Sequence, residues 1–315
     1  MRIAMFAVLA FASLCQAEER TTGTPKTPTF AADSHIVNIA VSVTNVAGTR
    51  YIEDLRMGDF SVYEDGTPQN IDPVLFGKDI LPISLVILMD CSDSMRTAFP
   101  LAQKAAAGFI QTMRPQDEAR VVAFASSGQV IQEFTDDPSL LERATASLTV
   151  RGNTRLYDTL YEHLRTLTNR FPQQERRRII VLLTDGEDIG SLSSDDDVLE
   201  AARTSGVAVY SIWLPHDVEN PTRREQARKG FWFLRQLASK TGGTVTALKA
   251  PDGLPSAYAA LTQELRTQYH LGYQPRLAER PRTWRTVSVF VKRDDVVVRH
   301  RAGYYAPTAP KPLLP

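Results

Sequence analysis

Three short segments of the chain are rich in oxygen-bearing side chains, which makes them candidates for metal binding. Residues 90–94 (DCSDS) and 185–188 (DGED) each follow an apolar run, and residues 152–154 (GNT) precede a helical pattern. Carboxylate and hydroxyl oxygens suit Mg²⁺, Mn²⁺ or Ca²⁺ rather than zinc or copper. In an extended loop, side chains two residues apart point the same way. The candidate metal ligands are Asp90, Ser92, Ser94, Thr154 and Asp185.

The charge of such a site indicates what it could bind. Hydroxyls and a few carboxylates would not fully neutralise the double positive charge of such a cation. The bound ion would therefore stay electropositive and accept a carboxylate from another molecule. Each segment also has a plainer interpretation, because Ser, Asp and Thr are common helix N-caps and Asp-Gly is a common turn pair. The metal interpretation is favoured by the three segments together, since they fall at the ends of predicted strands in the right order.

The elements that would position these segments lie between residues 80 and 267. Apolar runs predict strands at 81–89, 119–125, 178–184 and 207–213, with edge strands at 128–134 and 244–248. Helical patterns alternate with them, at 98–113, 138–148, 156–170, 196–205, 231–240 and 253–267. This alternation predicts an α/β fold, a Rossmann-like and mostly parallel sheet with helices on both faces. Ligands of such sheets bind beyond the carboxyl ends of the strands, where the strand order reverses.

Both ends of the chain carry a different pattern. Residues 35–46 alternate apolar and polar side chains, with Val37, Ile39, Val41 and Val43 on one face, and further strands are predicted at 60–63, 71–76, 268–274, 283–292 and 296–301. We expect residues 35–78 and 268–306 to form one small β-sandwich beside the central domain, 80–267.

The first residues are typical of a secretory signal peptide. A positive start, an apolar run over residues 3–14 and small residues up to Ala17 predict cleavage after residue 17. Residues 18–34 then form a flexible leader and 307–315 a flexible tail. An alternative is a lipoprotein acylated on Cys15. We expect a secreted, periplasmic or cell-envelope protein with no membrane span after cleavage. Because 36 basic residues balance 36 acidic ones, we expect no binding of nucleic acid.

The loop motifs resemble a known family. Residues 90–95 (DCSDSM) resemble the Asp-x-Ser-x-Ser signature of the metal-ion-dependent adhesion site of von Willebrand factor A domains, which is found also in integrins. Thr154 and Asp185 look like the family's second-loop threonine and third-loop aspartate. Asp93 departs from the glycine that is most frequent there; it could raise ion affinity, favour Ca²⁺ or point to solvent. Cys91, the only cysteine of the mature chain, is also atypical, and we interpret it as a small buried hydrophobe.

Flanking segments extend the resemblance to bacterial VWFA-related proteins, abundant in acidobacteria. These segments are residues 59–71, 237–243, 264–276 and 301–305. The resemblance implies a Rossmann-like fold, a Mg²⁺ or Mn²⁺ site, and non-enzymatic binding of a protein through an acidic residue of that partner.

Two other functions remain open. A metal-dependent hydrolase of the phosphatase or esterase type could use the same cation, with Asp93, Glu187 or Asp188 as nucleophile or base. However, the sequence has no Gly-x-Ser-x-Gly elbow, Walker-type loop or His-rich zinc spacing. The ion could also merely tie loops together in a structural protein. Elsewhere, residues 215–232 are predicted to be a polar loop. Residues 176–178 (RRR) are predicted to be a solvated edge leading into a strand, with a phosphate site as the alternative.

Overall fold

The computed structural model describes residues 36–78, 81–170, 176–215, 220–275 and 283–306. The predicted signal peptide, leader and tail lie outside the described residues. No helix of the described ranges is long and apolar enough to cross a membrane.

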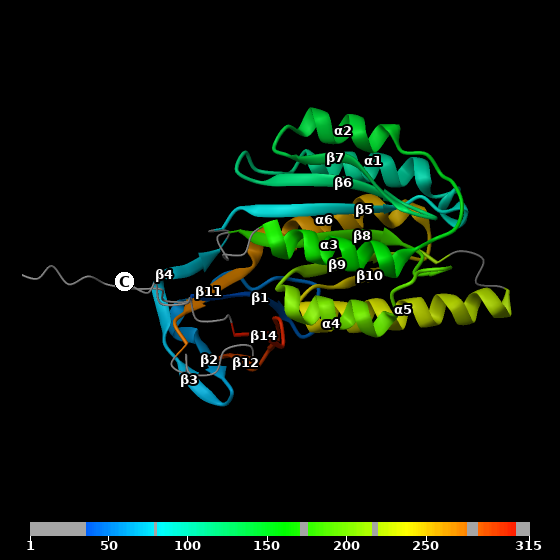
Figure 1. Ribbon diagram of the computed structural model, residues 1–315. Helices are drawn as coiled ribbons and strands as arrows, with labels where there is room; N and C mark the ends of the chain where they lie inside the picture. Colours follow the sequence, from blue (N-terminus) through cyan, green and yellow to red (C-terminus); the bar gives the residue numbers. More distant parts are fainter. Residues whose placement is uncertain (1–35, 79–80, 171–175, 216–219, 276–282, 307–315) are drawn as a thin grey trace, which may run out of the picture. The chain divides into compact units, whose positions relative to one another are not determined.

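A six-stranded sheet forms the central part of the fold, as predicted (Figure 1). Its strand order is β10-β9-β8-β5-β6-β7, and every neighbouring pair is parallel except β6 and β7. The order reverses beside β5, whose neighbours are β6 and β8. The strands are β5 (Ile83–Asp90), β6 (Glu118–Phe124), β7 (Gly128–Thr135), β8 (Arg177–Thr184), β9 (Ala208–Trp213) and β10 (Val245–Ala247).

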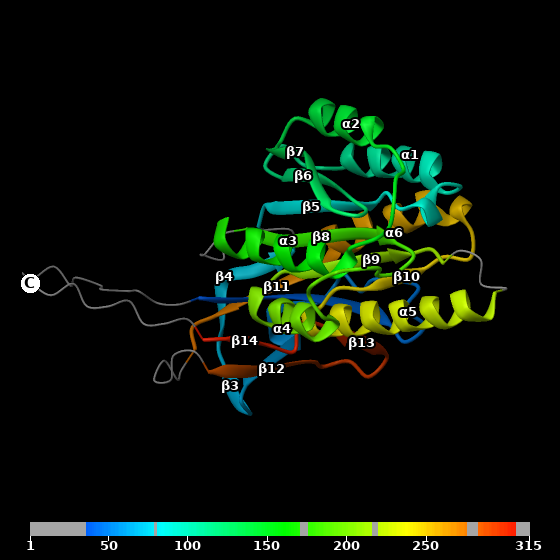
Figure 2. The ribbon, with the colours of Figure 1, turned by 45° about the vertical axis from the view of Figure 1, so that its right-hand side comes forward.

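Helices cover both faces of this sheet (Figures 1 and 2). One hydrophobic core lies under α1 (Phe99–Ile110), α2 (Pro138–Ser147) and α6 (Leu254–Thr267). The other lies under α3 (Leu156–Arg170), α4 (Asp195–Ser205) and α5 (Pro221–Thr241). All residues of β5 and β8 are buried, which explains their near-continuous apolar runs.

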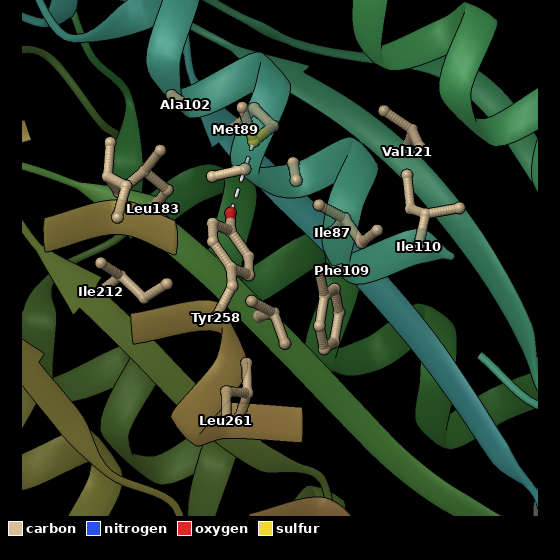
Figure 3. Packing of buried hydrophobic residues seen from close by; sticks show 14 of the residues in the cluster. Ile87, Met89, Ala102, Phe109, Ile110, Val121, Leu183, Ile212, Tyr258 and Leu261 are labelled. Carbon is tan, nitrogen blue, oxygen red and sulfur yellow. Dashed lines mark hydrogen bonds between the residues drawn. The ribbon is translucent and has the colours of Figure 1, made fainter. Parts of the chain in front are cut away.

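The first core is closely packed around an aromatic side chain of α6 (Figure 3). Tyr258 lies against the ring of Phe109 at 5.4 Å, and its hydroxyl donates to the sulfur of Met89 at 3.9 Å. Burying each large apolar side chain contributes roughly 1.5–3 kcal/mol. The rigid sheet that results is the support for the loops at its carboxyl edge.

Strands from the two ends of the chain form the predicted sandwich. One sheet has the order β13-β1-β11-β4 and the other β14-β12-β2-β3. Their facing side chains share a third core, including the four alternating residues of β1. The strands are β1 (Val37–Asn45), β2 (Phe60–Glu64), β3 (Thr67–Gln69), β4 (Ile71–Lys78), β11 (Tyr269–Tyr273), β12 (Trp284–Val291), β13 (Val296–Arg299) and β14 (Gly303–Tyr305). Strands β3 and β14 are too short to show a sequence pattern.

The sandwich and the central sheet are joined by direct contacts. Residues from Ser34 onward form one compact unit. The amide of Gln268, between α6 and β11, donates to Tyr210 of β9 at 2.8 Å and to Ser42 of β1 at 2.9 Å. The domain boundaries at residues 78–80 and 267–268 therefore stay a prediction.

Two expectations from the sequence are wrong. The predicted loop 215–232 is helical from Pro221, because Asn220 caps α5 by accepting hydrogen bonds from the backbone N–H groups of Thr222 and Arg223. The first half of α5 is mostly polar, so it lacks an apolar period. Residues 216–219 lie outside the described part of the chain.

The arginines at the start of β8 are not a solvated edge. Arg177 and Arg178 are only 7% and 8% exposed. Arg177 donates to the carbonyl of Leu265 at 2.6 Å. Burial and then the charge of Arg301 lower the pKa of Arg178 to about 10. The sandwich covers this edge of the sheet, which the local sequence cannot reveal.

Candidate functional site

Three loops meet at the carboxyl edge of the central sheet. The first loop (90–94) follows β5 and the third loop (185–188) follows β8, and these two strands are parallel neighbours in register. Asp90 and Asp185 therefore end adjacent strands at the same edge. The second loop (152–154) precedes α3 and crosses to the first loop, as the next contacts show.

Backbone hydrogen bonds hold the second loop against the first. The N–H of Arg151 donates to the carbonyl of Cys91 at 2.7 Å, and the N–H of Asp93 donates to the carbonyl of Gly152 at 3.1 Å. Gly152 has a φ of +71°, and a Cβ there would lie 2.6 Å from the hydroxyl of Ser126. Glycine therefore permits both the left-handed turn and the close approach.

Two neighbouring carboxylates lie beneath the loops, fully withdrawn from solvent. Asp90 accepts hydrogen bonds from the N–H of Ser92 at 2.9 Å and the hydroxyl of Thr184 at 2.7 Å. Asp185 accepts from the N–H of Glu187 at 3.0 Å. Burial raises the pKa of Asp90 to about 7, and the nearby charge of Asp185 adds to the rise. A bound cation would offset this repulsion.

Hydroxyl groups of the first and second loops line an open cavity of about 660 Å³, whereas Asp90 and Asp185 are not among its lining residues. The hydroxyls of Ser92 and Ser94 are 2.9 Å apart, although residues 93–95 form a 3-10 turn rather than an extended loop. Thr154, Arg223 and Lys249 line the same cavity. The structure thus brings hydroxyls of the first and second loops to one cavity.

The donor set fits a hard cation. Within the described ranges, no group of three or more His, Cys, Asp and Glu side chains could hold a metal ion. The candidate set instead combines two carboxylates with three hydroxyls, which are all oxygen ligands. Such a set suits Mg²⁺, Mn²⁺ or Ca²⁺ better than a soft metal.

Helix α5 fixes the third loop at very close range. Gly186 has a φ of +84°, and a Cβ placed on Gly230 of α5 would lie 2.2 Å from the carbonyl oxygen of Gly186. The indole N–H of Trp213 donates to the carbonyl of Asp185 at 2.7 Å. Two glycines in contact and one indole therefore set the backbone that carries Asp185.

The other acidic residues of the third loop already have partners. Glu187 is nearly buried and pairs with Arg223 at 3.1 Å. Asp188 accepts from the N–H of Tyr157 at 3.0 Å and from the hydroxyl of Ser191 at 2.6 Å, so it stabilises the start of α3.

The two atypical residues of the first loop have plain structural explanations. The side chain of Asp93 is 61% exposed and pairs with Arg96. Of the three roles considered for Asp93 from the sequence, the structure agrees with the one in which its side chain points to solvent. Cys91 is buried and free, and burial together with the charge of Asp90 raises its pKa to about 12. This agrees with its interpretation as a small hydrophobe.

Three residues near the site were not identified from the sequence. Thr184 bonds to Asp90, and Arg223 and Lys249 contribute positive charge to the cavity. Thr184 immediately precedes the third loop and could have been noted. Arg223 and Lys249 belong to a helix and a connection that are distant in sequence, so only the fold brings them to the cavity.

Together these features define a Rossmann-like α/β domain whose candidate site is formed by three loops at the switch point of the sheet. Residues 85–187 match the family model for the von Willebrand factor type A domain. This part of the chain is therefore similar to a von Willebrand factor A domain. None of the curated proteins matches the sequence.

Several solved structures resemble the chain in fold. The D319A mutant of the PilB minor pilin from Streptococcus sanguinis is 14% identical, with a TM-score of 0.50, over 62% of this chain and 63% of the pilin. A von Willebrand factor type A protein from Catenulispora acidiphila is 16% identical over 88% and 76% of the two chains, with a TM-score of 0.48. The mussel byssus protein PTMP1 with a zinc-occupied MIDAS motif is 18% identical over 62% and 48%, with a TM-score of 0.48.

Proposed function

We propose that the protein is a non-enzymatic binding module that holds one divalent cation and, through it, binds an acidic residue of a partner protein. The residues that would hold the ion are Asp90, Ser92, Ser94, Thr154 and Asp185. The observation that carries the proposal is the placement of hydroxyls from two loops in one open cavity, at the sheet edge where two buried carboxylates repel each other. Mg²⁺ is the favoured ion, with Mn²⁺ or Ca²⁺ as alternatives.

The charge at the site supports binding of an acidic group. A divalent cation would be held by at most two negative charges, and the hydroxyls contribute none. The open cavity also contains the basic side chains of Arg223 and Lys249. Lys249 is exposed. The acidic side chains of Asp93 and Glu187 line the same cavity and balance these two basic side chains, so the ion itself would supply the attraction for a carboxylate from solvent.

The surroundings favour binding over hydrolysis. A hydrolase would need a free nucleophile or base beside the ion. Asp93 pairs with Arg96 and is directed to solvent, Glu187 pairs with Arg223, and Asp188 caps α3. These contacts support the non-enzymatic alternative. We also propose that the protein is secreted, periplasmic or attached to the cell envelope, on the basis of the apolar run at residues 3–14.

The first test measures ion binding directly. Calorimetric titration with Mn²⁺ and Mg²⁺ should show one site in the wild-type protein and none in Asp90→Ala or Thr154→Ala. Asp93→Ala, which removes an exposed neighbouring carboxylate outside the ligand set, is the matched control and should bind as the wild type does. Equal binding by all four proteins would contradict the assigned ligands.

The second test asks whether a partner protein is retained only when the cation is present. Envelope proteins of the source organism would be passed over immobilised wild type, Asp90→Ala and Asp93→Ala, each with Mg²⁺ or with EDTA. We expect at least one protein to be retained only by wild type and Asp93→Ala, and only with Mg²⁺. Identical retention in every condition would exclude a metal bridge. Turnover of generic phosphate or ester substrates with Mn²⁺, lost in Asp90→Ala, would favour the hydrolase instead.

A further inference from the structure

A second, smaller cavity lies at the opposite end of the central sheet from the loop cavity. It is about 80 Å³ in volume, and its lining includes the first residues of β8 and residues of β1, β11 and the segment before β14. Strand β8 separates it from the third loop by eight residues, or roughly 25 Å. The two sites are therefore physically independent.

Two residues that line this cavity, His270 and Arg301, each have a buried nitrogen atom without a hydrogen-bond partner. Tyr269 and Leu271 pack into the sandwich core, so His270, between them on β11, points to the other side. His270 is 1% exposed, and its Nε2 has no hydrogen-bond partner. The Nε of Arg301 is also buried without a partner, although its Nη2 donates to the carbonyl of Asn38 at 3.1 Å.

Unpartnered buried groups of this kind need an explanation. Leaving a buried donor unsatisfied costs about 1–3 kcal/mol. His270 is held neutral, because burial and the charge of Arg177 lower its pKa to about 3. A neutral imidazole carries one N–H, and in the Nε2–H tautomer that group is a buried donor on a residue that lines the cavity. A ligand that accepts hydrogen bonds from both donors would remove the cost.

The charge of the lining specifies the sign of that ligand. Arg176, Arg177, Arg178 and Arg301 line the cavity, and no carboxylate of the described residues does. A Cβ on Gly206 would lie 2.7 Å from Nη2 of Arg178 and 3.2 Å from Nη1 of Arg301, so both guanidinium groups reach the same point. The C-termini of α4 and α5 also lie at this cavity. Their helix dipoles together carry about one unit of negative charge, which offsets only part of the positive charge of the arginines.

We propose that this cavity binds a small tetrahedral oxyanion, inorganic phosphate or sulfate, through Arg301 and His270. Arg301 is the charged donor and His270 the neutral donor. The small volume of about 80 Å³ suits a free ion better than an ion that carries an organic group. The bound ion would join the sandwich to the central sheet and thus stabilise their contact.

The test compares the thermal unfolding of the full chain in different anions. At pH 7 and equal ionic strength, 10 mM phosphate or sulfate should raise the Tm by about 3 °C relative to chloride. Glycerol 3-phosphate should give no rise. Broadening of the ³¹P resonance of inorganic phosphate, but not of glycerol 3-phosphate, should accompany it. An equal Tm in phosphate and chloride, or an equal rise with the ester, would overturn the proposal.

Variants locate the effect. Arg301→Gln removes the charged donor, and Ala40→Leu fills the cavity from β1 without changing any charge. Both should lose the phosphate-dependent rise, whereas Arg228→Gln, which removes an exposed guanidinium of α5, should keep it. If Arg301→Gln does not fold, Ala40→Leu and the ³¹P measurement on wild type decide. A full rise in Ala40→Leu would refute the assignment to this cavity.

Discussion

The contact between Gly186 and Gly230 allows a sharp prediction about how α5 positions the third loop. In the substitution Gly230→Ala, the new Cβ would lie 2.2 Å from the carbonyl oxygen and 2.6 Å from the carbonyl carbon of Gly186. Both neighbours are backbone atoms, so no side-chain rotation can relieve the clash. Either α5 or the third loop must shift.

The size of the effect follows from two opposing contributions. Replacing glycine by alanine within a helix normally stabilises a protein by about 1 kcal/mol. Overpacking costs about 1–3 kcal/mol, and contact with a carbonyl group this close belongs at the upper end. We therefore expect Gly230→Ala to be destabilised by about 1–2 kcal/mol. Gly108→Ala in α1, whose Cβ would meet nothing within 4 Å, should instead gain about 1 kcal/mol.

Urea unfolding of both variants beside wild type measures these free energies of unfolding. Both substitutions change helix propensity by the same amount. The difference of about 2–3 kcal/mol between the free energies of unfolding of the two variants is therefore the steric cost at Gly230. If the cation is held as proposed, Gly230→Ala should also bind Mn²⁺ more weakly, because Asp185 directly precedes the displaced glycine. Stabilisation of Gly230→Ala equal to that of Gly108→Ala would refute this account of the contact.

Two further predictions concern buried titratable groups. Burial and then the charge of Arg120 lower the pKa of His163 to about 4, so between pH 6.5 and 4 the unfolded chain binds a proton that the folded chain does not. Stability should therefore fall by about 3 kcal/mol across this range because of His163. Unfolding of His163→Leu followed at several pH values should show a smaller loss; an unchanged loss would exclude this residue as the cause. The thiol of Cys91, buried and with its pKa raised to about 12, should not react with Ellman's reagent at pH 8 in the folded protein and should react fully in denaturant. Rapid reaction before unfolding would show that the first loop opens.

Much of the fold could be predicted because burial leaves a direct mark on the sequence. Strand β5 is buried on both faces and is apolar almost throughout, whereas β1 is buried on one face and alternates. The predicted sandwich and the mostly parallel sheet follow from these two patterns. The first and third loops of the candidate site could be located because they follow buried strands, β5 and β8.

Features created by packing between distant segments left no such mark. The polar first half of α5 has no apolar period, and only Asn220 and Pro221 indicate where it begins. The buried arginines of β8 look like a solvated charge run until the sandwich is placed over them. Arg223 and Lys249 reach the loop cavity from segments far along the chain. Each of these requires the tertiary structure.

The pairing of the two chain ends has a consequence for the order in which the protein can assemble. Val41 of β1 pairs with Tyr269 of β11, and Val62 of β2 pairs with Val289 of β12. During synthesis the apolar faces of β1 and β2 stay uncovered until more than two hundred further residues have been added and β11 and β12 are available to pair. A chain that stops before β11 and β12 leaves β1 without either neighbour and β2 paired only with β3, and such open edges favour aggregation. The sandwich can therefore form only after both of its halves have been synthesised.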